Sequence, residues 1–344
     1  MDETIASVTA TALGSAGVCW NDLDRKGYVV VPSFLTASEI EHFRADYDAA
    51  DRAAKLHDAG PDEATRAEDA IDMPYKVRHV GPPARTAIEV KLDAVAAAVT
   101  AATTIRVNSH AGGAFGNIYF TTSGDRGLSW HQDSVSYYAY QNHHDYLNFY
   151  IPIVKPVREK SNLSVIPFDA LAARSPEMWR KIRGKGATRF VAKRGATVVH
   201  DNDAGGTYGS LPYLLDEIAV TPELGAGDLL LLRGDMIHRT QDTTTRRVAL
   251  SLRMMNARTR VRRAALVRGG LIKTIVMVQL RTDFGRLFDC FDAAGRDELT
   301  VDEMAALEAS VERVARPRSK TEFLRFLLWG RLRAWLSPSP AGGE

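Results

Sequence analysis

The chain has 344 residues, of which 45% are hydrophobic and 25% charged, an ordinary globular composition that allows one large domain with an appendage or two domains. Its formal net charge of +2 excludes an overall basic character, and nucleic-acid binding usually needs a concentrated basic face. Eight arginines and lysines do gather between Arg258 and Arg286, and we interpret them as a solvated surface. We therefore expect no nucleic-acid partner.

Cysteine content and hydropathy indicate the cellular compartment in which the protein is expected. The two cysteines, Cys19 and Cys290, are far apart and provide neither a disulfide framework nor a cysteine-rich metal site. The N-terminus is acidic and no long apolar run follows it. No segment reaches the ~20 apolar residues that a membrane-spanning helix requires. We expect a soluble, cytoplasmic protein.

The N-terminal part predicts a strand followed by helices. Residues 26–35 are rich in β-branched side chains and predict a short strand that ends at a proline. Thr36 and Glu39 have the spacing of a capping box, which marks the start of a helix. The apolar residues of that helix recur at helical spacing on one face, namely Ile40, Phe43 and Tyr47. An alanine- and valine-rich segment at about 86–100 predicts a second helix.

From about residue 114 to residue 256 short strand-like runs alternate with turns, and a helical stretch at 175–182 interrupts them. Several short strands punctuated by glycine and proline predict an antiparallel sandwich or barrel. The fold class is therefore α+β, with a β core and N-terminal helices packed against it. The expected strands are 115–121, 146–154, 163–167, 197–200, 217–221, 228–232 and 247–254.

Residues 271–344 predict a helical C-terminal extension, so we divide the chain into a domain at 1–270 and this extension. Residues 292–303 resemble a calcium-binding EF-hand loop. Arg296 stands at a ligand position, however, and Asp297 at the position of the obligatory glycine. We expect a helix–turn–helix without calcium.

The segment 323–336 combines apolar residues with arginines, and two interpretations stay open for it. It could lie in a membrane interface, as such helices do when they carry arginine on their polar face. We favour packing on its own domain or on a second subunit in a homo-oligomer, because an apolar helix face usually has to be buried.

The sequence Trp130-His131-Gln132-Asp133 is the most informative tetrapeptide of the chain. In an extended segment, residues i and i+2 project to the same side, so His131 and Asp133 can address one point. A second histidine would complete a face of two histidines and one carboxylate, which is diagnostic of non-haem Fe(II) oxygenases.

We assign the second histidine to His238, which ends a leucine-rich and therefore buried strand entered through Gly227-Asp228. His143 and His144 are adjacent in a tyrosine-rich loop, and His200 opens a loop rich in glycine and aspartate, so they rank behind it.

An isolated His-x-Asp pair is common as an ordinary surface or hydrogen-bonded pair, because short motifs have a high false-positive rate. A cationic residue downstream of His238 favours a functional site instead. Arg247 follows His238 by nine residues and begins the next strand, where its guanidinium can bind a carboxylate with two parallel hydrogen bonds. Arg246 would face the opposite side of that strand.

Together, these residues resemble the phytanoyl-CoA dioxygenase family over roughly residues 25–256. The resemblance lies in the order and spacing of several pieces, namely 27–35, Trp130-His-Gln-Asp133, Leu163-Ser-Val-Ile-Pro167, Gly227-Asp228, His238 and Arg247-Val-Ala-Leu-Ser251. It implies a double-stranded β-helix, a jelly-roll barrel with the metal at its open end.

The resemblance also implies the cofactors and their ligands. His131, Asp133 and His238 would bind Fe(II), and Arg247 would bind the distal carboxylate of the cosubstrate 2-oxoglutarate, with O2 as the oxidant. Thr240 matches a hydroxyl position that assists this carboxylate, and Gln132 matches the motif. The implied reaction is hydroxylation of a small molecule with release of succinate and CO2, and desaturation or ring closure are variants.

Departures from the family pattern concern the substrate. The chain reads Pro167-Phe-Asp-Ala170 where relatives often have Pro-Gly-Ser-His, so an acyl-CoA substrate does not follow from the family name. Tyr137, Tyr138 and Tyr140 could contact substrate or could pack the barrel rim, since exposed loops do both. A zinc hydrolase or isomerase with the same ligands, and a non-catalytic barrel that only binds a ligand, are the alternatives.

Overall fold

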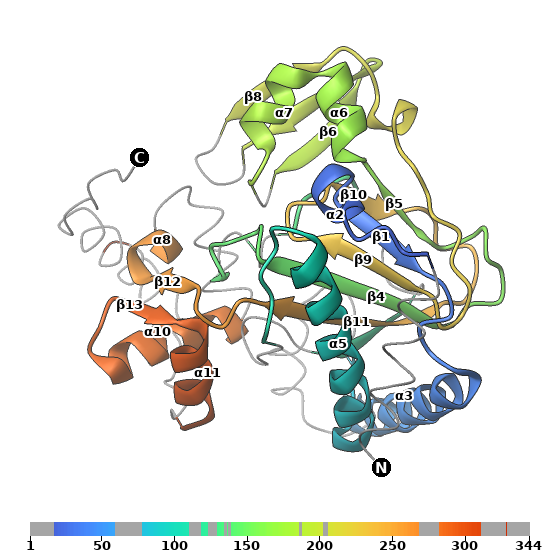
Figure 1. The fold of residues 1–344 in the computed structure, drawn as a ribbon, viewed down its shortest axis with the longest axis vertical. Coiled ribbons are helices and arrows are strands. Elements are labelled where there is room, and N and C mark those ends of the chain that lie inside the picture. Colours follow the sequence, from blue (N-terminus) through green and yellow to red (C-terminus); the bar gives the residue numbers. More distant parts are fainter. Residues whose placement is uncertain are drawn as a thin grey trace.

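The computed structural model describes residues 17–58, 78–109, 118–122, 129–133, 136, 139–185, 188–201, 206–267, 282–310 and 328. Within them, a six-stranded sheet forms the centre of the molecule (Figure 1), and every neighbouring pair of its strands is antiparallel. Its strands are, in spatial order, β1 (Tyr28–Val31), β9 (Leu229–Arg233), β4 (Tyr146–Val154), β11 (Val248–Met255), β3 (Tyr119–Thr122) and β2 (Arg78–His79).

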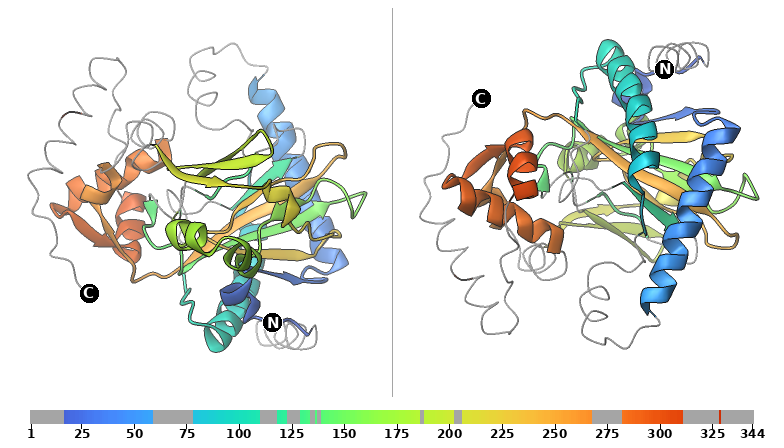
Figure 2. Two further views of the ribbon diagram at one scale, coloured as in Figure 1. Left: turned by 90° about the horizontal axis from the view of Figure 1, so that it is seen from above. Right: turned by 90° about the horizontal axis from the view of Figure 1, so that it is seen from below.

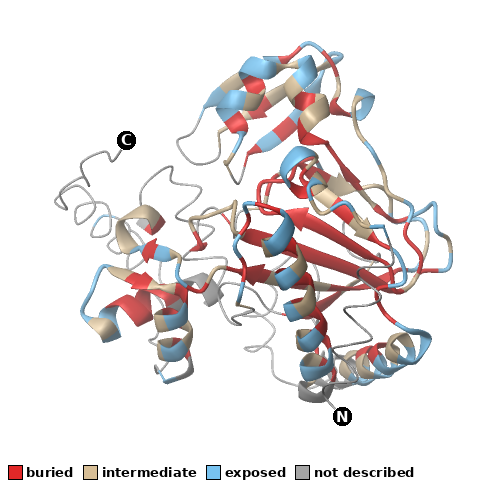
Figure 3. Ribbon diagram, viewed as in Figure 1, coloured by how far each residue is buried: buried red, intermediate tan, exposed pale blue. Residues whose placement is uncertain are grey.

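One face of this sheet is apolar and is covered by the helices α3 (Ala37–Asp58) and α5 (Pro82–Ala102), as Figures 1 and 2 show. Alternate residues of the central strands supply this face, because successive side chains of a strand point to opposite sides. Figure 3 shows the central strands as almost wholly buried. The buried cluster joins residues of α3 and α5 to Leu147, Phe149, Ile151, Leu250 and Leu252.

The opposite face of the sheet looks toward a second layer of strands. This layer pairs β10 (His238–Thr240) with β5 (Leu163–Val165), and β7 (Ala196–His200) with β6 (Arg189–Lys193) and β8 (Thr207–Leu211). The segment 129–133 connects the two groups, because His131 forms bridges to both His238 and Arg189. The helices α6 (Phe168–Arg174) and α7 (Pro176–Ile182) pack on the strands β6, β7 and β8 through a second apolar cluster.

The capping box at the start of α3 is present as the sequence predicts. The Glu39 N–H donates to Thr36 Oγ1 at 3.3 Å, and the Thr36 N–H donates to the Glu39 carboxylate at 2.7 Å. The same carboxylate accepts a hydrogen bond of 2.8 Å from Lys91 Nζ of α5. The residues that cap α3 therefore also join the two helices that cover the sheet.

The mixed helix-and-sheet fold is confirmed, and most predicted strands form within a few residues of their expected ends. The strand expected at 217–221 is wrong. A short 3-10 helix, η3 (Leu215–Glu217), forms because the Glu217 carboxylate accepts the Leu214 N–H at 3.1 Å, and beyond it the chain makes a single bridge at Val220. The strands β6 and β8 were not predicted. Only one residue of each is buried, Phe190 in β6 and Leu211 in β8, so neither shows the apolar alternation typical of a strand.

The central sheet and the second layer lie face to face, and the strand pairings among the described residues do not close a barrel. No helix in the described ranges is both long and apolar enough to cross a membrane. Of the segment 323–336, only Leu328 lies within the described residues, so both interpretations of that segment stay open. The domain boundary near residue 270 likewise stays a prediction.

The C-terminal part contains α8 (Arg263–Val267), β12 (Arg260–Arg262), α10 (Thr282–Ala294), β13 (Glu298–Thr300) and α11 (Val301–Ser310). The helix–turn–helix expected around residues 292–303 is present as α10, β13 and α11. In it, Arg296 donates a hydrogen bond of 2.7 Å to Glu303, and Arg263 donates one of 2.6 Å to Asp292. Guanidinium groups thus engage both carboxylates that would end a calcium loop.

We predict that Thr36→Ala lowers the free energy of unfolding by about 1 kcal/mol, because the mutation removes the side-chain acceptor for a helix N–H. Thr36→Ser keeps the hydroxyl and should stay close to the wild type. Urea unfolding of the two variants followed by circular dichroism measures the difference. Equal losses in both variants would contradict a role for the cap.

Candidate metal centre

His131 and His238 are brought together by backbone hydrogen bonds. The His131 N–H donates to the His238 carbonyl at 3.0 Å, and the His238 N–H donates to the His131 carbonyl at 2.9 Å. Residues that exchange both bonds in this way are direct antiparallel partners, with Cα atoms ~5.5 Å apart. Their rings accordingly lie side by side, with centroids 4.4 Å apart.

Both imidazoles direct Nε2 toward the same point. The Nδ1 atom of His131 donates to the Ser129 carbonyl at 2.7 Å, and that of His238 donates to the Met236 carbonyl at 3.0 Å. Because a carbonyl only accepts, these bonds place the ring proton on Nδ1 and leave the Nε2 lone pair for a metal.

Asp133 completes the cluster two residues after His131. Its Oδ1 lies 3.6 Å from Nε2 of His131 and 3.7 Å from Nε2 of His238. One ligand atom of each of the three residues lies within 4.8 Å of the others. Two imidazoles and one carboxylate facing one point fit a non-haem Fe(II) ion, with coordination positions left for other ligands.

The ionisation of the three groups suits a metal site. Burial opposes the charge on Asp133, but the electrostatic effects of His131, His238 and Arg253 outweigh it and lower the pKa of Asp133. Burial and then the charge of His131 lower the pKa of His238 to about 4. Burial also disfavours the charged form of His131, yet Asp133 raises its pKa above the ordinary 6.5.

The second oxygen of Asp133 points away from the histidines and is held by other residues. Asn148 Nδ2 of β4 donates to Asp133 Oδ2 at 3.0 Å, and Nη2 of Arg253 lies 4.0 Å from the same oxygen. This bond fixes the orientation of the Asn148 amide, because only its nitrogen can donate. The buried amide oxygen has no hydrogen-bond partner in the described part of the structure.

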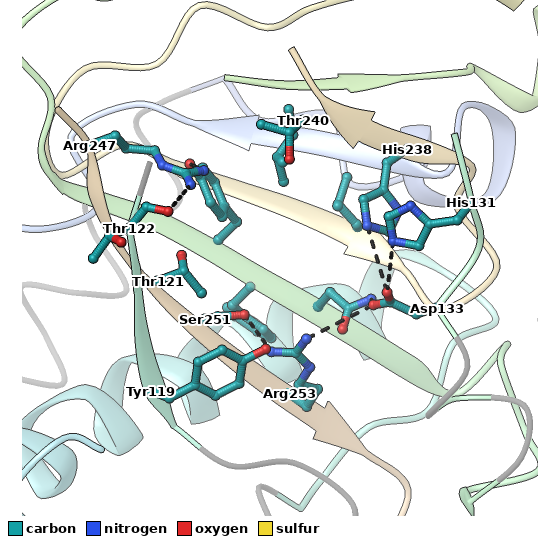
Figure 4. A pocket seen from close by; sticks show the side chains of 15 residues that line it. Tyr119, Thr121, Thr122, His131, Asp133, His238, Thr240, Arg247, Ser251 and Arg253 are labelled. Atoms are coloured by element: carbon teal, nitrogen blue, oxygen red, sulfur yellow. Dashed lines mark hydrogen bonds and ion pairs between the residues drawn. The ribbon is translucent and has the colours of Figure 1, made fainter. Parts of the chain in front are cut away.

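A pocket opens in front of the three ligands, between the central sheet and the second layer. Figure 4 shows Arg247 at one end of it and His131, Asp133 and His238 at the other, with Thr240 between them. The other lining residues come from β3, β4, β5, β9 and β11, namely Tyr119, Thr121, Thr122, Asn148, Phe149, Tyr150, Leu163, Leu232, Ser251 and Arg253.

Arg247 is held rigidly although it lines the pocket. It is only 6% exposed, and its Nη1 donates to the Tyr150 hydroxyl at 2.6 Å while its Nη2 donates to the Thr122 carbonyl at 3.1 Å. A guanidinium held in this way can bind a carboxylate with two parallel hydrogen bonds. The pocket therefore has the metal-ligand triad at one end and a buried arginine at the other.

Two residues predicted to act in the site have other contacts. Gln132 is 2% exposed and points away from the pocket, since its side chain donates to the Asp235 carbonyl at 2.7 Å and accepts a hydrogen bond from Thr188. A role in cofactor binding does not fit this position. The reason is the same alternation that directs the two residues beside it to the metal.

Tyr140 is also buried, and its contacts favour the packing interpretation. Its hydroxyl donates to the Asp145 carbonyl at 2.9 Å and accepts the Asn256 N–H at 2.7 Å, and it is not among the residues that line the pocket. Tyr137 and Tyr138 lie outside the described residues, so a contact between them and substrate stays a prediction.

Asn148, Tyr150 and Arg253 belong to the pocket although the sequence did not single them out. A signal for all three was present in the strand pattern. Tyr150 and Asn148 alternate with core residues along β4, as Arg253 does along β11, so each is a polar residue on the inner side of a buried strand.

Most of the chain matches a known protein family. The model of the family described as phytanoyl-CoA dioxygenase (PhyH) matches residues 23–249. No curated protein sequence matches the chain significantly.

Several solved structures are similar at low identity. One is the non-heme alpha ketoglutarate dependent epimerase SnoN from nogalamycin biosynthesis (16% identity, 70% of this chain and 82% of that chain, TM-score 0.38). Others are HygX from Streptomyces hygroscopicus with nickel and 2-oxoglutarate bound (16%, 68% and 84%, 0.37) and EctD from S. alaskensis with bound Fe (15%, 69% and 75%, 0.42). The family assignment rests on the match to the family model.

We predict that metal affinity rises with pH through the neutral range. His131 has a raised pKa in the metal-free protein, so below that pKa a proton occupies the nitrogen that the metal needs. Each pH unit below the pKa should weaken binding by about ten-fold. Anaerobic Fe(II) titrations between about pH 5.5 and 8 measure the effect. His42→Gln, at an exposed histidine, is the control and should leave the profile unchanged. A flat profile in the wild type would contradict the prediction.

We further predict that Asn148→Leu weakens metal binding by about 10–100-fold, because the mutation removes the hydrogen bond that orients Asp133. Asn148→Asp should weaken it more, since a second carboxylate would face Oδ2. Fe(II) or Mn(II) titration measures both variants, and urea unfolding checks that they fold. Asn21→Leu, at an exposed asparagine, is the matched control. Unchanged affinity in folded Asn148→Leu would exclude this role.

Proposed function

This chain belongs to the phytanoyl-CoA dioxygenase family, and on that premise we propose that it is an Fe(II)- and 2-oxoglutarate-dependent oxygenase that hydroxylates a small molecule. The observation that carries the proposal is one pocket with a metal-ligand triad at one end and the buried Arg247 at the other. We also propose that the two layers of sheet belong to the double-stranded β-helix expected for this family.

The roles of the residues follow from their positions. His131 and His238 present neutral Nε2 atoms and Asp133 presents one charge, so Fe(II) bound there keeps net positive charge and open positions. Arg247 is placed to bind the distal carboxylate of 2-oxoglutarate. Thr240 lines the pocket between Arg247 and the triad (Figure 4), and this position supports a role for its hydroxyl in assisting the carboxylate.

Iron, 2-oxoglutarate and O2 together supply an oxidant able to attack an unactivated C–H bond, with release of succinate and CO2. The protein positions the groups and limits side reactions. Leu163 and Leu232 line the pocket with apolar side chains. Asn148 donates the hydrogen bond that orients the Asp133 carboxylate. Asp133 argues against halogenation, which needs a small residue in its place to admit chloride. Hydroxylation is the proposed outcome, and desaturation or ring closure would use the same residues.

A zinc hydrolase or isomerase with the same three ligands is the second candidate, because the ligand set also suits zinc. It leaves the buried Arg247 and its contacts with Tyr150 and Thr122 without a function. Anaerobic addition of Fe(II) and 2-oxoglutarate to the metal-free protein separates the two.

For the oxygenase we expect a weak visible charge-transfer band in the wild type that is lost in His131→Ala. A folded wild type that binds metal but shows no band would overturn the oxygenase and favour zinc. An oxygenase should also release succinate when a substrate is supplied.

We predict that Arg247→Met weakens 2-oxoglutarate binding by about 2–5 kcal/mol and leaves Fe(II) affinity unchanged, because the arginine binds the cosubstrate and lies at the far end of the pocket from the metal ligands. Titration of the charge-transfer band with 2-oxoglutarate measures the loss. Arg246→Met is the matched control, since Arg246 is an exposed neighbour. Equal effects of the two mutations would argue against the assignment of Arg247.

A further inference from the structure

A buried polar network lies behind the metal ligands, on the side away from the pocket, and Gln132 is its centre. Gln132 is 2% exposed, and both ends of its amide are bound. Its Nε2 donates to the Asp235 carbonyl at 2.7 Å, and its Oε1 accepts a hydrogen bond from the Thr188 hydroxyl. Because the Asp235 carbonyl can only accept, the amide has a single orientation. The proposed reaction does not use these groups.

Asp235 is itself held by a buried ion pair. Arg233, the last residue of β9, donates to its carboxylate twice, from Nε at 2.7 Å and from Nη2 at 2.9 Å. The Gly184 N–H donates to the same carboxylate at 3.0 Å. Arg233 and Asp235 are 3% and 0% exposed, and a guanidinium that binds a carboxylate through two hydrogen bonds has a defined geometry. The carbonyl that Gln132 binds is therefore fixed to the end of a central strand.

The turn that contains Asp235 also orients His238. The Met236 N–H donates to the Arg233 carbonyl at 3.0 Å, which closes the turn. The Met236 carbonyl accepts the Nδ1 proton of His238 at 3.0 Å, and this bond directs Nε2 toward the metal site. The Gln132 amide is thus bound to the peptide next to the one that orients the third ligand.

Gln132 lies between the other two ligands in the chain, His131 and Asp133. In the described part of the structure, the segment 129–133 pairs with β10 through one isolated bridge, between His131 and His238. One bridge fixes the distance between two residues but leaves the segments able to rotate about it. The Gln132 side chain supplies a second connection between this segment and the turn before β10, so the two connections together fix the angle between them.

Thr188 extends the network to the second layer of strands. It directly precedes β6, it is 1% exposed, and its carbonyl accepts the Gln132 N–H at 3.3 Å. The backbone and the side chain of Gln132 therefore bind the same residue. An apolar residue of equal size would fill this space, but it would leave the Asp235 carbonyl and the Thr188 hydroxyl without this partner, which is costly for buried groups.

We propose that Gln132 is a positioning residue, whose amide sets the angle between segment 129–133 and the turn that orients His238. Through that angle it determines how His131 and Asp133 meet the same metal as His238. This inference rests on the proposed function, because it takes these three residues as the ligands of one metal. Loss of the amide should leave three ligands in the protein but change the coordination geometry that they provide.

The test uses the complete metal-free protein and Co(II), whose visible absorption reports its coordination geometry. Gln132→Met keeps the size of the side chain and removes both hydrogen bonds of its amide. We expect Co(II) to bind this variant more weakly, by about ten-fold or more, and with a changed spectrum. Thr188→Val removes one of the two bonds and should change both readouts less, in the same direction. Thr188→Ser keeps the hydroxyl and should restore the wild-type spectrum.

Gln241→Met is the matched control, because Gln241 uses its amide in the same way outside the pocket. Its Nε2 donates to the Glu159 carbonyl at 3.0 Å, and its Oε1 accepts the Asn162 N–H at 3.1 Å. Removal of these bonds should leave the affinity for Co(II) and its spectrum as in the wild type.

A wild-type affinity and spectrum in folded Gln132→Met, or equal losses in Gln132→Met and Gln241→Met, would overturn the inference. If circular dichroism shows that Gln132→Met does not fold, Thr188→Val decides: an unchanged spectrum overturns the inference and a changed one supports it. Co(II) binding that His131→Ala leaves unchanged would instead mark failure of the proposed metal centre.

Discussion

The site depends on one pair of backbone hydrogen bonds, those that His131 and His238 exchange. These residues are more than a hundred positions apart in the sequence, yet the exchange makes them direct partners with neighbouring rings. The same extended segment carries Asp133 to the metal side and Gln132 to the interior. A register shift of one residue would exchange these directions, so the pairing of segment 129–133 with β10 determines whether a metal site exists.

The two faces of the central sheet have different roles, because successive side chains of each strand point to opposite faces. The face toward α3 and α5 provides a large buried apolar cluster. The inner face of the same strands carries polar residues such as Asn148, Tyr150 and Arg253. Because each strand is anchored by its apolar side, the polar side chains opposite can be held in place without contributing to the core. This arrangement supplies a preorganised pocket on rigid strands.

Charge distribution within the pocket gives each group its role. Asp133 lies between two imidazoles on one side and Asn148 and Arg253 on the other, and the imidazoles and Arg253 outweigh the effect of burial on its ionisation. Arg247 donates to a hydroxyl and to a carbonyl, and these hydrogen bonds hold its guanidinium in the pocket wall. Two arginines of the pocket thus differ in their surroundings: Arg253 of β11 lies beside the metal ligands, and Arg247, which precedes β11, lies at the far end of the pocket.

The sequence by itself determined the elements and the residue types of the site. The capping box at Thr36, the long strand at 146–154 and the metal-ligand candidates His131, Asp133 and His238 could all be predicted, because they depend on local spacing and alternation. Only the tertiary structure decided which polar residues share the pocket. Asn148 and Arg253 meet at Asp133 because β4 and β11 are neighbours in the sheet, and Tyr140 is buried by contacts with residues of a distant loop. Such contacts depend on strand order and register, which residues far apart in the chain fix together.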